Sequence, residues 1–268
     1  MTQVGFAGAG RMGAPMVRRL VGAGHEVRTL GRSVEKRRAV RELGAQPVTD
    51  LADVGDGAEV VVICVFTDEQ VVKVCLDSVL LTTMPPGSAL VIHTTGRPRT
   101  AESIAAEAEP HGIAVVDAPA SGGPHDIAAG HVTLFVGGSD DAVERVRPVL
   151  DAYGDPVLHV GPIGAGQSVK LINNALFAAQ IGLLHEAVRL GERFGVGERR
   201  LLDAIGHGSA ASRVASIVGA RGSVDAFIDI LGEFVGKDVE VVRKVAAELG
   251  SELGVLDDAI NAGLRHNT

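Results

Sequence analysis

Apolar residues in the first half of the chain occur in short runs, and longer amphipathic segments separate these runs. Six runs have the length and composition of buried strands. They are Val4–Ala7, His25–Leu30, Val60–Val65, Ala89–His93, Ile113–Val116 and Val132–Val136. Five segments between and after them have helical patterns: Met12–Val21, Val34–Leu43, Glu69–Leu80, Thr100–Ala108 and Asp140–Leu150. This alternation predicts an α/β fold around a parallel sheet.

A helical pattern replaces the alternation near Ala165. The stretch from Ala165 to about Phe194 is apolar on nearly every face, so we expect a long helix that is buried on all sides. Three more helical segments follow: Glu198–Ile205, Asp225–Leu249 and Gly254–Leu264. Gly and Pro interrupt the first pattern at Asp155–Gly161. We therefore expect an α/β domain over residues 1–162 and an all-helical domain over residues 163–268.

The composition predicts an aliphatic interior and small-molecule chemistry. Aromatic residues make up 3% of the chain, and the formal net charge is -8. Nucleic acid and anionic membranes would be repelled by this charge. Cys64 and Cys75 are too few for a disulfide framework or a four-ligand zinc site, and we expect no metal. With no recognisable signal peptide or membrane-spanning run, we expect a cytoplasmic protein.

A glycine motif, Gly8-Ala9-Gly10-Arg11-Met12-Gly13, directly follows the first predicted strand and opens the first predicted helix. In this context GxGxxG is the Rossmann fingerprint for a dinucleotide. The first glycine permits the tight turn, the second allows close approach of the pyrophosphate, and the third allows the helix to pack on the strand. A glycine turn without a ligand is the alternative.

The end of the second predicted strand bears on the choice of cofactor. NAD-binding chains usually place an acidic residue there, whereas this chain has Gly31-Arg32-Ser33. The Arg32 guanidinium is suited to a 2′-phosphate, so we favour NADP. Two alternatives remain, because Arg32 can be a solvated surface cation and Glu35 can turn inward to favour NAD.

Two further motifs are candidates for the chemistry. Lys170 and Asn174 lie four residues apart, on one face of the long apolar helix. A cation in the opening turns opposes the helix dipole, and burial lowers the pKa of a lysine, which suits a proton donor or acceptor. The alternative is a lysine that extends to water.

Asp117 follows a predicted strand, and Ser121 with the N–H groups of Gly122 and Gly123 is suited to a substrate carboxylate. A plain strand-to-turn connection is the alternative.

With these motifs in order, the chain resembles the β-hydroxyacid dehydrogenase family, which includes 3-hydroxyisobutyrate dehydrogenase, tartronate semialdehyde reductase and 6-phosphogluconate dehydrogenase. The resemblance runs through almost the whole chain. It rests on the Gly8–Gly13 fingerprint, the Asp117–Gly123 motif, and Lys170 with Asn174. It implies that Lys170 and Asn174 are the catalytic pair.

The resemblance also implies further cofactor contacts. Val65 and Phe66 would contact the cofactor through their backbone, and Thr95 would lie beside the nicotinamide ribose. Lys237 would close over the nicotinamide. Taken by itself, Lys237 would be a surface lysine, and Asp238 next to it would give no pairing on the same helix face.

Several positions depart from the family pattern. Thr67 stands where the family commonly has Pro, Ile92 where an acidic residue is frequent, and Gly31 where Asn often precedes the arginine. Ala120 and the segment Pro124–Asp126 differ from the best-known members. The substrate is therefore open.

The expected function is NAD(P)-dependent oxidation of a small β-hydroxy acid to its semialdehyde or 3-oxo acid, with the reverse reduction. An imine reductase is one alternative, although such enzymes typically lack the lysine. An idle NADPH-binding sensor or scaffold is the other. The 35 glycines and the small side chains of the long helix favour close packing in a homo-oligomer. We therefore expect residues 1–162 to be the dinucleotide-binding domain and residues 163–268 to be the substrate and oligomerisation domain.

Overall fold

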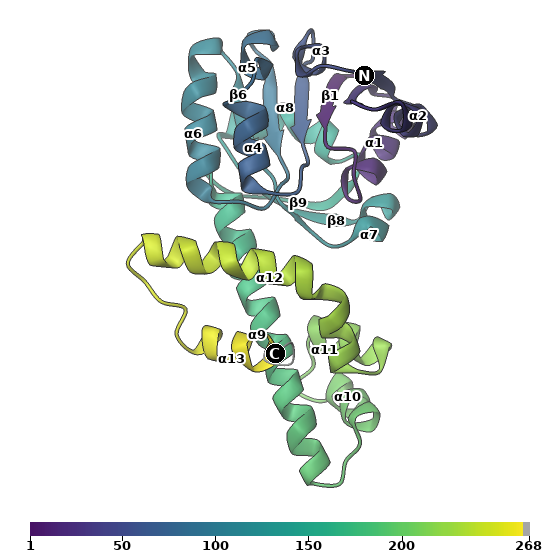
Figure 1. The fold of residues 1–268 in the computed structure, drawn as a ribbon, viewed down its shortest axis with the longest axis vertical. Coiled ribbons are helices and arrows are strands. Elements are labelled where there is room, and N and C mark those ends of the chain that lie inside the picture. The colour runs from purple at the N-terminus through teal and green to yellow at the C-terminus, as the bar shows by residue number, and fades with distance from the viewer. Residues whose placement is uncertain (265–268) are drawn as a thin grey trace. The chain divides into compact units, whose positions relative to one another are not determined.

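The computed structural model describes residues 1–264, with the side chains of residues 230–235 and 264 left out. The chain forms two compact units, which divide between Lys170 and Leu171. The first unit is an α/β sheet structure of the Rossmann type, and the second is helical (Figure 1). The predicted fold class is thus confirmed. Among the described residues, no helix has both the length and the apolar character needed to cross a membrane.

Nine described strands make one mixed sheet in the first unit. The strands are β1 (Gln3–Ala7), β2 (Glu26–Leu30), β3 (Gln46–Val48), β4 (Val60–Ile63), β5 (Ala89–Ile92), β6 (Ala114–Asp117), β7 (Ala120–Ser121), β8 (Val132–Gly137) and β9 (Gly154–Gly161). Their order is β3-β2-β1-β4-β5-β6-β8-β7, and β9 pairs with β8. Strands β1 to β6 run parallel, so their carboxyl ends share one edge, where open α/β sheets bind ligands.

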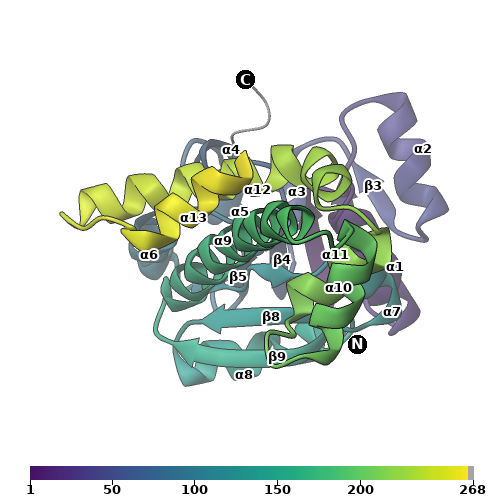
Figure 2. The same cartoon turned by 90° about the horizontal axis from the view of Figure 1, so that it is seen from below.

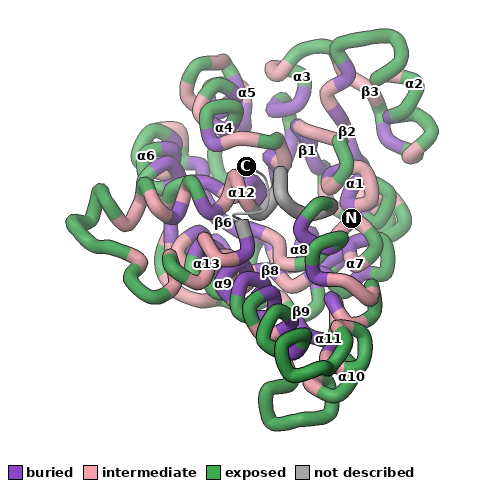
Figure 3. Tube along the Cα trace, turned by 60° about the horizontal axis from the view of Figure 1, so that its bottom comes forward, coloured by how far each residue is buried: buried purple, intermediate pink, exposed green. Residues whose placement is uncertain are grey.

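Helices cover both faces of the sheet. They are α1 (Gly13–Gly22), α2 (Val34–Glu42), α3 (Leu51–Gly55), α4 (Asp68–Cys75), α5 (Leu80–Thr83), α6 (Pro98–Ala108), the 3-10 helix η1 (Glu109–His111), α7 (Pro124–Ala129) and α8 (Asp140–Leu150). Alternate residues of one strand enter different cores: Val60 and Val62 pack with α1 and α8, whereas Val61 and Ile63 pack with α3 to α6. Figure 3 shows the buried strands in purple and the outer helix faces in green.

Five helices, α9 to α13, make up the helical part of the described chain. They are α9 (Ala165–Arg193), α10 (Glu198–His207), α11 (Arg213–Arg221), α12 (Val224–Glu248) and α13 (Val255–Leu264). Helix α9 begins in the first unit and continues through the second (Figure 2). Ile181 and Val188 of α9 pack against α10, α11 and the start of α12, and Ala175 packs against Val239 of α12 and Ile260 of α13.

The prediction that α9 is buried on all sides is wrong for this chain. Ile172, Leu176, Leu183 and Leu190 are 64%, 47%, 60% and 50% exposed. The helices that follow α9 cover its other side, where Ile181, Leu184 and Val188 are buried. The apolar pattern of α9 therefore did not show which of its faces would pack against other helices of the same chain.

Other elements differ from the sequence pattern. The helix predicted over Glu69–Leu80 ends at Cys75, and the separate helix α5 begins at Leu80. Ser78, between them, donates to the carbonyl of Val74 and accepts the N–H of Leu80. The Gly and Pro positions at Asp155–Gly161 belong to strand β9 rather than to an interruption. The elements β3, α3, η1, β7, α7 and α11 were not predicted.

Candidate active site

The glycine turn after β1 has the geometry that a dinucleotide needs. Gly8 has a φ of +111°, and a Cβ there would lie 2.1 Å from the carbonyl oxygen of Cys64. A Cβ on Gly13 would lie 2.2 Å from the Gly8 carbonyl oxygen, whereas a Cβ on Gly10 would meet nothing within 4 Å. Gly8 and Gly13 are thus packed against other backbone atoms, whereas there is open space beside Gly10. The adjoining end of α1 has no side-chain cap, so its N-terminus fits an anion.

The loop after β2 presents cationic and hydroxyl groups. Arg32 and Ser33 are exposed, and Ser33 caps α2 by accepting the N–H of Lys36 at 3.2 Å. The guanidinium of Arg37 donates to the carbonyls of Gly31 and Arg32. A Cβ on Gly31 would lie 3.0 Å from Cγ of Arg37, so a larger residue before Arg32 would require Arg37 to shift.

The N–H groups of the residues after β4 have partners within the protein. Val65 donates its N–H to Oγ1 of Thr94 at 3.0 Å, and Phe66 donates its N–H to Oε1 of Gln70 at 2.9 Å. Thr67 caps α4 and forms a capping box with Gln70, so it starts the helix at the position where the family commonly has Pro. Backbone contacts from Val65 and Phe66 to a cofactor would therefore run through groups other than these N–H donors.

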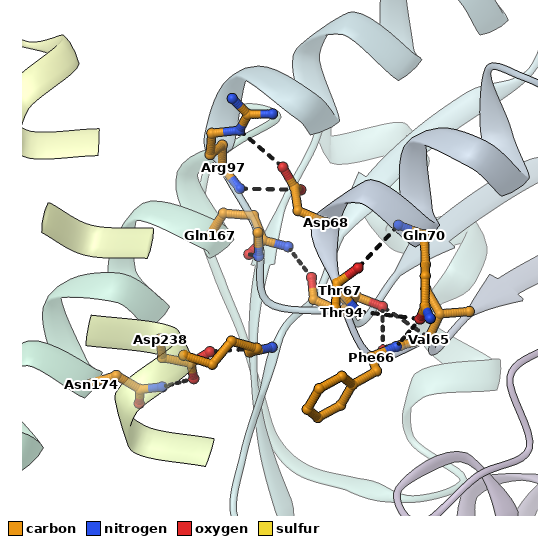
Figure 4. A network of polar contacts seen from close by, with 12 residues as sticks. Val65, Phe66, Thr67, Asp68, Gln70, Thr94, Arg97, Gln167, Asn174 and Asp238 are labelled. Atoms are coloured by element: carbon orange, nitrogen blue, oxygen red, sulfur yellow. Dashed lines mark hydrogen bonds and ion pairs between the residues drawn. The ribbon is translucent and has the colours of Figure 1, made fainter. Parts of the chain in front are cut away.

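Two buried side chains hold the loop after β5 (Figure 4). Gln167 donates to the carbonyl of Thr94 at 2.8 Å and accepts the N–H of Gly96 at 2.9 Å. Asp68 accepts the N–H of Arg97 at 3.3 Å and the hydroxyl of Thr100 at 2.8 Å. Thr95, the predicted ribose neighbour, lies between the two peptide groups that Gln167 engages.

Asp117, at the end of β6, is the anchor for the start of α9. Its two carboxylate oxygens accept the N–H groups of Gly164 and Gln167, each at 2.7 Å. These are among the backbone donors that the first turn of a helix leaves unpaired. Asp117 is fully buried, and burial raises its pKa to about 6 while the two backbone donors oppose that rise.

Beyond Asp117 the predicted substrate loop continues through β7. Ser121 is half-buried, and Gly122 has a φ of +141°. Gly123 donates its N–H to Oδ2 of Asp126 at 2.6 Å, where α7 begins. The sequence predicted that this N–H binds a substrate carboxylate, but in the structure it donates to Asp126. Among the described hydrogen bonds, none involves the N–H of Gly122.

Lys170 follows Gln167 on α9 and is buried, with 8% exposure. Asn174 is one helical turn further along the same helix. Its side-chain N–H donates to Oδ2 of Asp238 at 2.5 Å, and its Oδ1 accepts from Asn173 at 3.1 Å. Both amide ends of Asn174 are thus oriented by neighbours.

Lys237 does not behave as the isolated sequence pattern suggested. Its Nζ lies 3.4 Å from Oδ1 of Asp238, and its side chain is 26% exposed. The expectation of no pairing between these neighbours is wrong, because the long lysine side chain reaches the carboxylate although the two residues diverge around the helix.

Family models match nearly all of the chain. A model of the NAD binding domain of 6-phosphogluconate dehydrogenase matches residues 3–161, and a model of the NAD-binding region of NADP-dependent 3-hydroxyisobutyrate dehydrogenase matches residues 164–261. The chain belongs to the β-hydroxyacid dehydrogenase family. It is therefore an NAD(P)-dependent oxidoreductase, and the resemblance seen in the motifs is confirmed.

Relatives and solved structures agree with this membership. The NAD-dependent L-serine dehydrogenase of Pseudomonas aeruginosa is 36% identical over 192 residues, 71% of this chain and 64% of that protein. A probable 3-hydroxyisobutyrate dehydrogenase of Mycobacterium bovis is 35% identical over 205 residues, 76% of this chain and 69% of that protein. The structure of Mycobacterium tuberculosis 3-hydroxyisobutyrate dehydrogenase with L-serine has a TM-score of 0.89 and 28% identity, and the match covers 99% of this chain and 93% of that one.

Imine reductases share the fold alone. The enzyme from a Pseudomonas species has a TM-score of 0.64 at 23% identity, over 96% of this chain and 90% of that one. This likeness carries no argument about chemistry.

Sequence reasoning missed the residues that hold the site together. Asp68, Thr94, Gln167 and Asp238 were not predicted to have a role. Asp68 resembles an ordinary acidic residue in a first helical turn, and Gln167 is a common helix former. The sequence did offer one signal for Gln167: it is a polar residue directly after Gly166 and three residues before Lys170.

Proposed function

We propose that this β-hydroxyacid dehydrogenase interconverts a small 3-hydroxy carboxylate and its semialdehyde or 3-oxo acid. The bound nicotinamide would supply or accept the hydride. The single observation that carries the proposal is the burial of Lys170 in the opening turns of α9. A cation there opposes the helix dipole, so helix stability does not account for it.

Each remaining residue has a defined task in this proposal. Lys170 exchanges the proton with the substrate oxygen, and Asn174 orients that oxygen through the side-chain N–H that Asp238 does not take. Ser121 and the N–H of Gly122 bind the carboxylate, and the N–H of Gly123 remains with Asp126. Thr95 and the backbone at Val65 and Phe66 border the cofactor. Lys237 closes over the nicotinamide, a role that rests on the family alone.

The cofactor preferred in this proposal is NADP. Gly8, Ala9, Gly10, Arg11, Met12 and Gly13 would hold the pyrophosphate, which fits the open approach at Gly10. The exposed Arg32 would pair with the 2′-phosphate. The relative from Pseudomonas aeruginosa is named as NAD-dependent, so NAD is the competing cofactor. The division at residue 162, the homo-oligomer and the cytoplasmic location remain predictions from the sequence.

The test combines a substrate screen with variants of Lys170. Short 3-hydroxy acids, L-serine included, and one cyclic imine are assayed with both cofactors through nicotinamide absorbance. Lys170→Ala should lower kcat by about a hundredfold or more, as expected for loss of a general acid–base. The matched control is Lys73→Ala, which removes an exposed lysine of α4. Near-normal turnover by Lys170→Ala, or turnover of the imine alone, would contradict the proposal.

A further inference from the structure

The side chain of Gln167 bridges the two peptide groups that flank Thr95. Its Oε1 accepts the N–H of Gly96 at 2.9 Å, and its Nε2 donates to the carbonyl of Thr94 at 2.8 Å (Figure 4). Gln167 is 1% exposed. Because buried backbone groups are costly to leave unpaired, the bridge fixes the loop against the helix that carries Gln167.

The same residue is fixed through its own backbone. The N–H of Gln167 donates to Asp117, together with the N–H of Gly164. Lys170 follows three residues later, which is slightly less than one turn of α9. The Lys170 backbone therefore has a defined position relative to the Thr95 loop.

The loop has a second support that does not involve α9. Asp68 accepts the N–H of Arg97 and the hydroxyl of Thr100, and a Cβ on Gly96 would lie 2.0 Å from its Oδ1. Thr94 is bound to Val65 through its hydroxyl. These bonds attach the loop to α4, α6 and the end of β4, so the particular contribution of Gln167 is to connect it to the lysine-bearing helix.

We propose that Gln167 is a positioning residue, which sets the distance between the amine of Lys170 and the nicotinamide ribose beside Thr95. The inference rests on the proposed function. Hydride and proton transfer must be aligned in one site, and displacement of a reacting group by about 1 Å can cost about a hundredfold in rate. Loss of the bridge therefore lowers the rate of the chemical step more than it weakens cofactor binding.

The test compares Gln167→Met with Gln180→Met, which makes the same change elsewhere on α9. In Gln167→Met, the amide of Gly96 should exchange with deuterium faster in the unliganded enzyme. The value of kcat should fall about ten- to a hundredfold, the isotope effect from C4-deuterated reduced cofactor should rise, and the Kd of NADPH should change little. Gln180→Met should match the wild type throughout.

A second variant guards against misfolding of the first. In Gln167→Glu, the protonated carboxyl can accept from Gly96 and donate to Thr94, as the amide does. Its kcat relative to the wild type should therefore rise as the pH falls. A merely structural role would leave both this ratio and the isotope effect unchanged.

Three results would overturn the inference. They are unchanged kcat despite faster exchange at Gly96, a weaker Kd with an unchanged isotope effect, and a ratio for Gln167→Glu that does not respond to pH. If the wild type turns over no tested substrate, the proposed function fails, and the fluorescence of bound NADPH becomes the readout. Altered emission in Gln167→Met then supports the bridge, and unaltered emission contradicts it.

Discussion

Asn174 donates its side-chain N–H to Oδ2 of Asp238, 2.5 Å away, and thereby has a defined amide orientation. A carboxylate can only accept, so the nitrogen of Asn174 must face Asp238. Asn173 donates to the amide oxygen from the other side. The N–H that the proposed function assigns to the substrate oxygen is thus held in place by a residue of α12.

Changing Asp238 should impair the orientation of Asn174. Asp238→Ala removes the acceptor, and a lost hydrogen bond to a charged group costs about 1.5–3 kcal/mol. We expect kcat to fall about tenfold or more, with little change in the Kd of NADPH. Asp238→Asn keeps an acceptor oxygen for Asn174 but loses the charge beside Lys237, so it should retain more activity than Asp238→Ala. Equal losses in both variants would assign the effect to Lys237 instead, and wild-type kcat in Asp238→Ala would refute the prediction.

Arg32 should decide between the two cofactors. Arg32→Ala removes the guanidinium proposed to meet the 2′-phosphate, and a charge-assisted bond of about 1.5–3 kcal/mol corresponds to about a ten- to hundredfold weaker Kd. Fluorescence titration should show this loss for NADPH and little change for NADH. Arg41→Ala, in the last turn of α2, is the control for overall charge. An equal loss for both cofactors would show that Arg32 does not contact the phosphate.

The glycine turn offers a paired test of cofactor binding against stability. Gly10→Ala adds a Cβ that meets no protein atom within 4 Å, so the melting temperature should change little. The same methyl group would obstruct the pyrophosphate, and the Kd of NADPH should weaken about tenfold or more. Gly13→Ala places a Cβ 2.2 Å from a backbone oxygen and should lower the melting temperature, since overpacking costs about 1–3 kcal/mol or more. Unweakened NADPH binding by Gly10→Ala would remove this turn from the cofactor site.

Local patterns predicted the regular elements better than the contacts between them. Helix α8 has the predicted bounds, Asp140–Leu150, because its serine cap and apolar periodicity lie within one segment. The catalytic candidates Lys170 and Asn174 were identifiable because a polar pair in an apolar helix is unusual. Gln167 and Asp68 were not, since their partners are 71 and 29 residues away. The exposure of Leu183 depends on where other helices pack, which no local periodicity contains.

The buried pair His93 and Tyr153 should make the stability of the protein depend on pH. Nδ1 of His93 donates to the carbonyl of Ala118 at 2.5 Å. Burial favours the neutral ring, in which Nε2 accepts the Tyr153 hydroxyl at 2.8 Å. Burial lowers the pKa of His93 from 6.5 to about 4. Its stabilising contribution is therefore complete above pH 6.5 and is lost as the pH falls toward 4. By this linkage, about 2.5 kcal/mol should be lost between pH 7 and pH 4.5.

Asp117 should act in the opposite direction over nearly the same range. Burial raises its pKa from 3.8 to about 6, so the folded state binds a proton more readily than the unfolded state, and stability rises as the pH falls through 6 toward 3.8. The two groups therefore partly offset each other in the wild type, and single variants separate them.

Urea unfolding should show that the destabilisation caused by His93→Gln becomes smaller between pH 7 and pH 4.5, whereas the destabilisation caused by Asp117→Asn grows by about 2 kcal/mol. Asp117→Asn is also destabilised at pH 7, because its amide group places a donor against the N–H of Gly164 or Gln167. Each variant controls for the other, since all remaining titrating groups are shared. If the destabilisation caused by the two variants changed with pH in the same direction, one of the two groups would not have the protonation state derived from its contacts.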